Sequence, residues 1–208
     1  MSRIFLVALV ASASTALPIN SLAQAPRAAA APASVQAPAG RGFDKTLSLQ
    51  GISFRVSSAN AGSVNQLRIQ PSGLKDNGAN ALIEKEIDGT VVDCEVADLN
   101  VDGSPELYVY VSSAGSGSYG SLVAYSVNKG KSITEIYIPP LTDDAEASAG
   151  YRGHDEFRVV ESVLVRRFPL YREGDTNAQP SGGIRQIQYR LKAGEAGWVL
   201  RVDQVIQY

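Results

Sequence analysis

Residues 91–125, VVDCEVADLNVDGSPELYVYVSSAGSGSYGSLVAY, decide the fold of this 208-residue chain. Within this stretch, residues 107–111 alternate aliphatic and aromatic side chains, which is the period-two pattern of a half-buried β-strand. A second strand is predicted to begin at Leu122. A Ser/Gly-rich connection, residues 112–121, joins the two. The stretch therefore predicts two neighbouring strands with a protruding loop between them.

The loop carries one large side chain, Tyr119, among serines, glycines and an alanine. It is longer than most hairpin loops, and long ordered loops on a rigid sheet often carry function. A tyrosine offers a large contact area with few rotatable bonds, and glycine lets the main chain approach another surface closely. The composition favours a binding loop as much as its alternative, a flexible solvated hairpin tip.

The rest of the chain repeats the strand pattern. Alternating apolar residues occur at 47–56, 133–138, 157–168, 187–191 and 198–206, and no stretch longer than about ten residues has a helical period. Only residues 142–150, TDDAEASAG, have the acidic start and glycine end of a short helix, and a loop is an equally good interpretation of them. The sequence predicts an all-β protein, an antiparallel β-sandwich of roughly eight strands in a single domain over residues 43–208.

Asp88-Gly89 has the composition of a two-residue hairpin turn. A hairpin closed there sets Ile83 opposite Cys94 and predicts that this only cysteine is a buried small hydrophobe. An intrachain disulfide is excluded, and the acidic neighbours Asp93 and Glu95 disfavour a reactive thiol.

The N-terminus has the features of an export signal. Arg3 precedes an apolar run that ends at Ser21-Leu22-Ala23, so residues 1–23 are predicted to be a signal peptide, too short to span a bilayer comfortably. Residues 24–42 are rich in Ala and Pro and are predicted to be a disordered linker. After cleavage, no membrane association is expected; the alternative is an uncleaved leader that serves as an N-terminal anchor.

The turn DLNVDG at residues 98–103 repeats the first half of a calcium-binding loop, with Asp98, Asn100 and Asp102 as candidate ligands. The twelfth position of such a loop would be Val109, which cannot bind a cation, although Glu106 stands at the ninth. A tight turn uses the same residue types and is the favoured interpretation. No metal and no cofactor are therefore predicted.

Charge and residue inventory argue against several functions. The formal net charge is −2, and loss of Arg3 makes it −3, which disfavours nucleic-acid binding. His154 is the only histidine, and no nucleophile motif accompanies it, so a structural role is favoured over catalysis. The chain is not expected to be an enzyme.

The sequence resembles the periplasmic inhibitors of invertebrate-type (i-type) lysozyme. Ser116-Gly117-Ser118-Tyr119 fits that family's Ser-Gly-x-Tyr motif directly after DLNVDGSPELYVYV. The related inhibitors of vertebrate-type lysozyme have one more residue between Ser-Gly and Tyr. The resemblance continues at four further segments: GHDEF at 153–157, RRFPLY at 166–171, GDTN at 174–177 and GEAGW at 194–198.

The resemblance implies a protein of the Gram-negative periplasm that protects peptidoglycan by binding i-type lysozyme. Ser116, Gly117, Ser118 and Tyr119 are the implied partner-binding residues, carried on a loop that enters the lysozyme cleft. Ser116 would bond near the catalytic carboxylates and Tyr119 would fill a sugar subsite. Exposed sheet edges could also pair two copies, so a homodimer stays open.

Two other classes stay open. One is a calcium-dependent or carbohydrate-binding β-sandwich module that uses the turn at 98–103 and a sugar platform made by Tyr108 and Tyr110. The other is a hydrolase that acts on cell-wall material with a pair of carboxyl groups.

Overall fold

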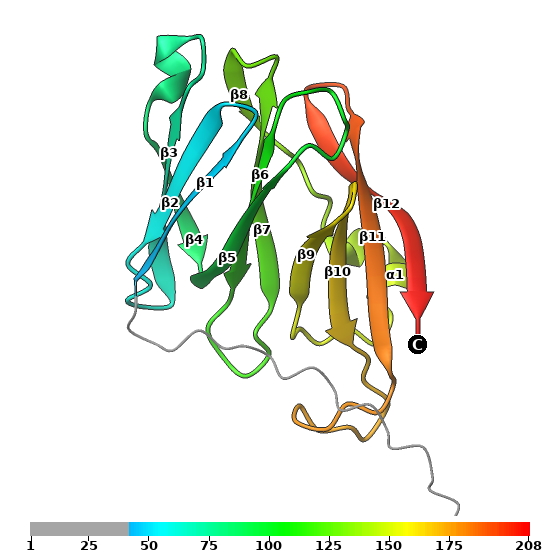
Figure 1. Cartoon of the computed structure of the whole chain (residues 1–208). Helices are drawn as coiled ribbons and strands as arrows, with labels where there is room; N and C mark the ends of the chain where they lie inside the picture. The colour runs from blue at the N-terminus through cyan, green and yellow to red at the C-terminus, as the bar shows by residue number, and fades with distance from the viewer. Residues whose placement is uncertain (1–41) are drawn as a thin grey trace, which may run out of the picture. The chain divides into compact units, whose positions relative to one another are not determined.

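The computed structural model describes residues 42–208 (Figure 1). The predicted signal peptide and nearly all of the predicted linker lie outside the described residues. The strands, in chain order, are β1 (Phe43–Leu49), β2 (Ile52–Ser58), β3 (Val64–Ser72), β4 (Ile83–Asp88), β5 (Thr90–Ala97), β6 (Glu106–Ser112), β7 (Gly120–Asn128), β8 (Ser132–Glu135), β9 (Glu156–Val160), β10 (Val163–Pro169), β11 (Ile184–Ala193) and β12 (Trp198–Gln207). The helical turns are η1 (Asn77–Asn80), η2 (Leu141–Asp143) and α1 (Ala145–Ser148).

The strands form three antiparallel sheets of four, which confirms the all-β prediction. Their orders are β1-β2-β3-β4, β5-β6-β7-β8 and β12-β11-β10-β9. The described residues thus contain twelve strands rather than roughly eight. One reason is that the apolar run at 157–168 folds into two strands, because the chain turns at Glu161, whose φ is 53°.

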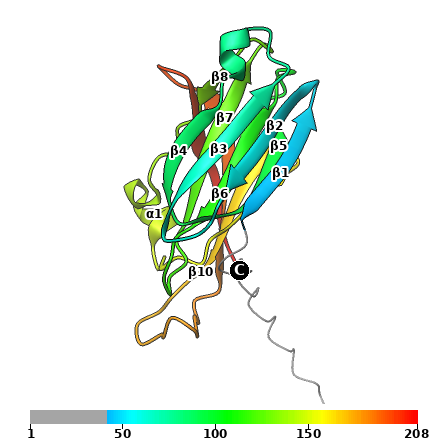
Figure 2. The same cartoon turned by 90° about the vertical axis from the view of Figure 1, so that its left-hand side faces the viewer.

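The β5–β8 sheet lies between the other two sheets (Figure 1). One core joins it to the β1–β4 sheet through residues such as Phe54, Leu67 and Val109. A second core joins it to the β9–β12 sheet through Tyr108, Phe168 and Ile187. Figure 2 looks onto the outer β1–β4 sheet, with the strands of the middle sheet behind it. The fold is therefore a sandwich extended to three layers.

Strand β6 is buried on both faces, so the prediction of a half-buried strand is wrong. Leu107 and Val109 face the first core, whereas Tyr108 and Tyr110 face the second and are 0% and 3% exposed. A strand covered on both sides is apolar throughout rather than alternately polar. This burial also overturns the sugar platform proposed for Tyr108 and Tyr110, because neither ring is accessible to a carbohydrate.

The Asp88-Gly89 turn does not close a hairpin. Strand β4 pairs with β3, and β5 pairs with β6, so the turn carries the chain from one sheet to the next. Both strands still contribute to the first core, where Cys94 is fully buried as predicted. A period-two pattern indicates which side of a strand is buried, but it does not indicate which strand pairs with it.

Gln50 and Gly51, at φ 52° and 80°, make a tight turn between β1 and β2. One smaller prediction agrees with the structure. Residues 142–150 contain α1, whose N-cap Asp144 accepts a hydrogen bond from the Ala147 amide. Among the described residues, no helix is both long and apolar enough to cross a membrane.

Candidate functional site

Residues 113–119, hereafter the tyrosine loop, connect β6 to β7 at the lower end of β6 in Figure 1. The loop is closed at its base, where the Ser113 amide donates to the Tyr119 carbonyl at 2.9 Å and the Tyr119 amide donates to Ser113 Oγ at 3.0 Å. An inner turn is closed by a 3.2 Å bond from the Ser118 amide to the Gly115 carbonyl. The loop is thus internally hydrogen-bonded.

The four predicted binding residues differ in exposure. Tyr119 is 50% exposed, and Ser116 is also exposed. Ser118 is buried, at 8% exposed, and has a φ of 41°, which is uncommon for a residue with a Cβ. Ser118 therefore shapes the loop, whereas Ser116 and Tyr119 face solvent.

Glycine gives the close approaches at two points, one within the loop and one where an adjoining segment meets it. A Cβ at Gly117 would lie 2.5 Å from the Tyr119 ring, so a side chain there would displace that ring. Gly153 has a φ of 93°, and a Cβ there would lie 2.0 Å from the Gly117 carbonyl oxygen. Residue 153 consequently fixes how closely the adjoining segment approaches the loop.

Two other segments hold the loop from outside. The His154 amide donates to the Gly117 carbonyl at 2.8 Å, and the Asn177 side-chain amide donates to the Ser116 carbonyl at 2.5 Å. Asn177 is itself held, because its carbonyl accepts a 3.0 Å bond from the Tyr171 hydroxyl. Three of the segments that carry the family resemblance, at 153–157, 166–171 and 174–177, therefore lie around the tyrosine loop. The fourth, at 194–198, lies at the turn between β11 and β12.

A buried ion pair lies at the base of the loop. Asp155 and Arg166 form a 2.6 Å bond, with their side chains 0% and 8% exposed. The other Asp155 oxygen accepts 2.6 Å bonds from the Gly120 amide and from the Tyr151 hydroxyl. Burial disfavours the charged form of Arg166, but the facing carboxylate outweighs this and raises the pKa of Arg166 above its ordinary value. One carboxylate thus fixes the first residue of β7.

Aromatic rings extend from this ion pair to the surface. Tyr119 meets Tyr151 edge to face at 5.6 Å, and Tyr151 meets Phe168 in the same way at 4.7 Å. The Arg166 guanidinium lies 5.1 Å from the centre of the Tyr151 ring. Such pairs have preferred geometries, so they orient the Tyr119 ring as well as supporting it.

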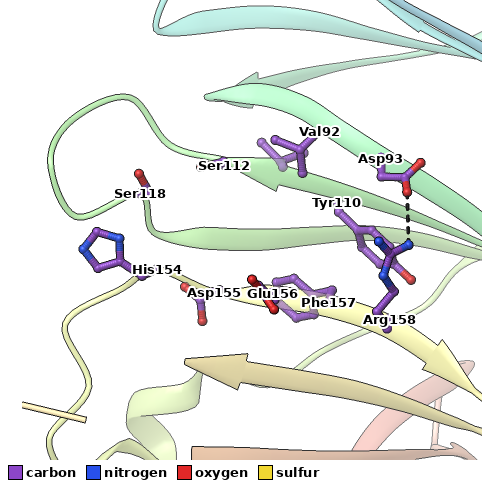
Figure 3. Close-up of a pocket in the computed structure, with 11 residues that line it drawn as sticks. Val92, Asp93, Tyr110, Ser112, Ser118, His154, Asp155, Glu156, Phe157 and Arg158 are labelled. Atoms are coloured by element: carbon purple, nitrogen blue, oxygen red, sulfur yellow. Dashed lines mark hydrogen bonds and ion pairs between the residues drawn. The ribbon is translucent and has the colours of Figure 1, made fainter. Parts of the chain in front are cut away.

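A groove of about 280 Å³ begins beside the loop and runs between β5, β6 and β9 (Figure 3). Ser118 and His154 lie at one end, and the Asp93–Arg158 ion pair, with N and O 3.3 Å apart, lies at the other. Tyr110 and Phe157, stacked at 5.7 Å, contribute the apolar lining. The groove therefore offers apolar surface with charged groups of both signs next to the exposed tyrosine.

The turn at residues 98–103, hereafter the acidic turn, lies at the opposite end of β6, near the top of Figure 1. Asp98 Oδ1 accepts a 3.0 Å bond from the Asp102 amide, and Asn100 Nδ2 donates to Asp102 Oδ2 at 3.0 Å. These are the hydrogen bonds of the predicted tight turn. Asp98, Asp102 and Glu106 each bring a carboxylate oxygen within 4.8 Å of the others. Burial, followed by the charges of Asp98 and Asp102, raises the pKa of Glu106 to about 8.

Sequence reasoning missed two components of these two regions and gave too little weight to a third. It identified the loop, but not that Asp155 and Asn177 hold it, because no local pattern reports a contact across more than 30 residues. It also left Glu106 a minor candidate. One signal in the sequence could have made Glu106 a stronger candidate: it is a carboxylate at the start of an apolar run that is predicted to be a strand.

Comparison with known proteins links both regions to one family. Residues 81–148 match the family model described as PliI, periplasmic lysozyme inhibitor of I-type lysozyme. No curated protein and no solved structure matches the chain. The matched residues include the acidic turn, β6 and the whole tyrosine loop. Over residues 81–148, this chain is thus similar to the periplasmic lysozyme inhibitors of I-type lysozyme, as its sequence motifs indicated.

Proposed function

We propose that this protein inhibits i-type lysozyme by placing the tyrosine loop in the enzyme's active-site cleft. The observation that carries the proposal is the state of Tyr119, which is half exposed on a loop that the rest of the protein holds in place. An exposed aromatic ring on a fixed support is the usual form of an interface anchor, because little conformational freedom remains to be lost on binding.

Ser116 and Tyr119 make the proposed contacts. Glycosidase clefts carry a pair of carboxyl groups flanked by sugar subsites. The Ser116 hydroxyl can donate to a carboxylate, and the Tyr119 ring can occupy a subsite that normally stacks on a sugar, with its hydroxyl left to bond a polar group. Gly117 and Ser118 contribute indirectly, since they set the position of the ring and of the turn.

The groove beside the loop extends the proposed interface. It is continuous with Ser118 and His154, and it contains both an acidic and a basic side chain, Asp93 and Arg158. A lysozyme surface beside the cleft would bury this lining, and rim charges of this kind adjust association rate and specificity more than affinity. The protein's net negative charge suits a basic partner.

We further propose that the protein acts in the Gram-negative periplasm after export and removal of residues 1–23. In that compartment the inhibitor would meet lysozyme that has crossed the outer membrane, before the enzyme reaches peptidoglycan. The substrate of lysozyme would be protected without any chemistry by the inhibitor itself.

A lysis assay tests the proposal. The purified protein is titrated against i-type, vertebrate-type and goose-type lysozymes, each acting on the same permeabilised cells. We expect protection against the i-type enzyme that reaches completion near an equimolar ratio. Absence of protection at tenfold excess, with a protein that unfolds cooperatively, would overturn the proposed function.

A further inference from the structure

A group of unsatisfied polar atoms lies beneath the acidic turn, in a part of the molecule that lysozyme binding does not use. Within the described residues, four buried side-chain nitrogen or oxygen atoms have no hydrogen-bond partner, and three of them are Glu106 Oε1, Tyr108 Oη and Ser126 Oγ. Glu106 lies directly opposite Ser126 in the pairing of β6 with β7, and Tyr108 is two residues along the same face of β6. Unpartnered buried polar groups are rare and costly, so their concentration at one place requires an explanation.

Glu106 is the central member of this group. Its side chain is 0% exposed, and its Oε2 accepts a 2.7 Å bond from the Leu99 amide, while its Oε1 has no partner. The Tyr108 hydroxyl lies within hydrogen-bonding reach of this carboxyl and lowers its pKa as a donor would, but the two groups do not meet in a well-formed hydrogen bond. A buried carboxyl group with a free oxygen is expensive unless a cation or a donor completes it.

The surroundings of Glu106 are acidic. Asp98 and Asp102 each bring a carboxylate oxygen within 4.8 Å of it and of each other. None of the ion pairs formed among residues 42–208 includes any of these three carboxylates. Asp102 is exposed and Asp98 is half-buried, so the cluster opens to solvent on the side away from Glu106.

We propose that Asp98, Asp102 and Glu106 bind a calcium ion. Three carboxylates with no basic partner supply the hard oxygen donors that calcium prefers, and the flexible coordination of calcium accommodates water as the remaining ligands. A bound ion would compensate the buried Glu106 carboxylate, which brings one of its oxygens into the cluster. Sequence alone favours a simple turn, because a tight turn uses the same residue types as Asp98, Asn100 and Asp102. A tight turn does not explain why Glu106 is buried with one carboxylate oxygen unpartnered.

Calorimetric titration of calcium into chelator-treated protein tests the site, together with thermal unfolding in EDTA and in calcium. We expect one ion per chain, and a melting temperature raised by roughly 5–10 °C when calcium is at a hundred times its Kd. The same shift with magnesium at equal concentration would contradict the assignment to calcium. Absence of both binding heat and a melting shift would overturn the site.

Two variants and one control locate the ion. Glu106→Gln and Asp102→Asn should each lose the calcium-dependent shift, and Asp102→Asn, an exposed position, guards against a misfolded Glu106→Gln. In EDTA, Glu106→Gln should melt no lower than the parent protein, because the amide removes a carboxyl group that lies against two others. Asp88→Asn changes an exposed carboxylate outside the proposed site and should keep the full calcium-dependent shift. A shift that persists in both variants would contradict the assigned ligands.

Discussion

A buried carboxyl group lies at each end of β6, and the two differ in whether their oxygens are fully hydrogen-bonded. At the tyrosine loop, the buried Asp155 has every oxygen bonded, to Arg166, Tyr151 and the Gly120 amide. At the acidic turn, the buried Glu106 has one oxygen with no partner and two further carboxylates beside it. A completed network makes a rigid support, whereas an incomplete one requires an explanation such as a missing ligand. The first end therefore supports the proposed anchor Tyr119, and the second is the site at which we propose a bound ion.

The largest expected effect comes from breaking the completed network. Asp155→Asn leaves the Arg166 guanidinium buried without its carboxylate, and the loss of one partner of a buried ion pair typically costs about 3–5 kcal/mol. The free energy of unfolding from urea denaturation measures this. Asp203→Asn, which breaks the exposed 2.8 Å pair with Arg190, is the control and should cost under about 1 kcal/mol. Equal losses in the two variants would mean that Asp155 is not a structural support.

The next effect is on binding rather than stability. Tyr119→Ala removes the proposed anchor and should weaken inhibition of i-type lysozyme by about thirtyfold, equivalent to about 2 kcal/mol. Tyr137→Ala is the matched control, because Tyr137 is similarly exposed, at 58%, but lies outside the loop. Both variants should unfold at the parent's temperature within a few degrees. Full inhibition by Tyr119→Ala would remove the loop from the mechanism.

A smaller effect tests whether the loop must be held in one position. Gly153→Ala places a Cβ against the Gly117 carbonyl, so the loop must shift and inhibition should weaken by roughly tenfold, near 1.4 kcal/mol. Gly130→Ala has a comparable positive φ, 66°, but open space around it. The control therefore carries the backbone strain without the collision. If both variants inhibit equally well, the position of the loop is not critical.

The smallest effect is the labelling of Cys94, which lies in the first core and away from both ends of β6. Burial, only partly offset by Lys45, raises the pKa of the Cys94 thiol to about 12. Roughly one thiol in ten thousand is then ionised at pH 8, and reagents require the thiolate. A thiol reagent at pH 8 should label the native protein negligibly and the urea-unfolded protein completely. Rapid labelling of the native protein would contradict the buried position of Cys94.

The sequence predicts the all-β class and the tyrosine loop because both depend on local patterns. Alternation along residues 107–111 indicates a strand, and a lone tyrosine among glycines and serines indicates a loop with a special side chain. The third layer could not be predicted in this way, because the tyrosine face of β6 has the same pattern whether sugar or another sheet covers it. The crossover at Asp88-Gly89 was missed for a related reason, since a hairpin and a change of sheet use the same turn residues.

The supports of the loop needed the structure for another reason. Asp155, Arg166 and Asn177 are ordinary polar residues in the sequence, and their role depends on contacts with residues 116–120 that lie far away along the chain. Glu106 likewise reads as the polar first residue of a strand. Its significance depends on burial and on an oxygen without a partner, which are properties of the folded protein.

The central claim is that the tyrosine loop occupies the active-site cleft of i-type lysozyme, and a competition measurement tests it most directly. The apparent Kd of the inhibitor for the enzyme is measured with increasing amounts of a short N-acetylglucosamine oligomer that fills the cleft. We predict that the apparent Kd rises linearly with the concentration of free saccharide, because inhibitor and saccharide exclude one another. An unchanged Kd on enzyme saturated with saccharide would contradict the claim and would place the inhibitory contact elsewhere on the lysozyme.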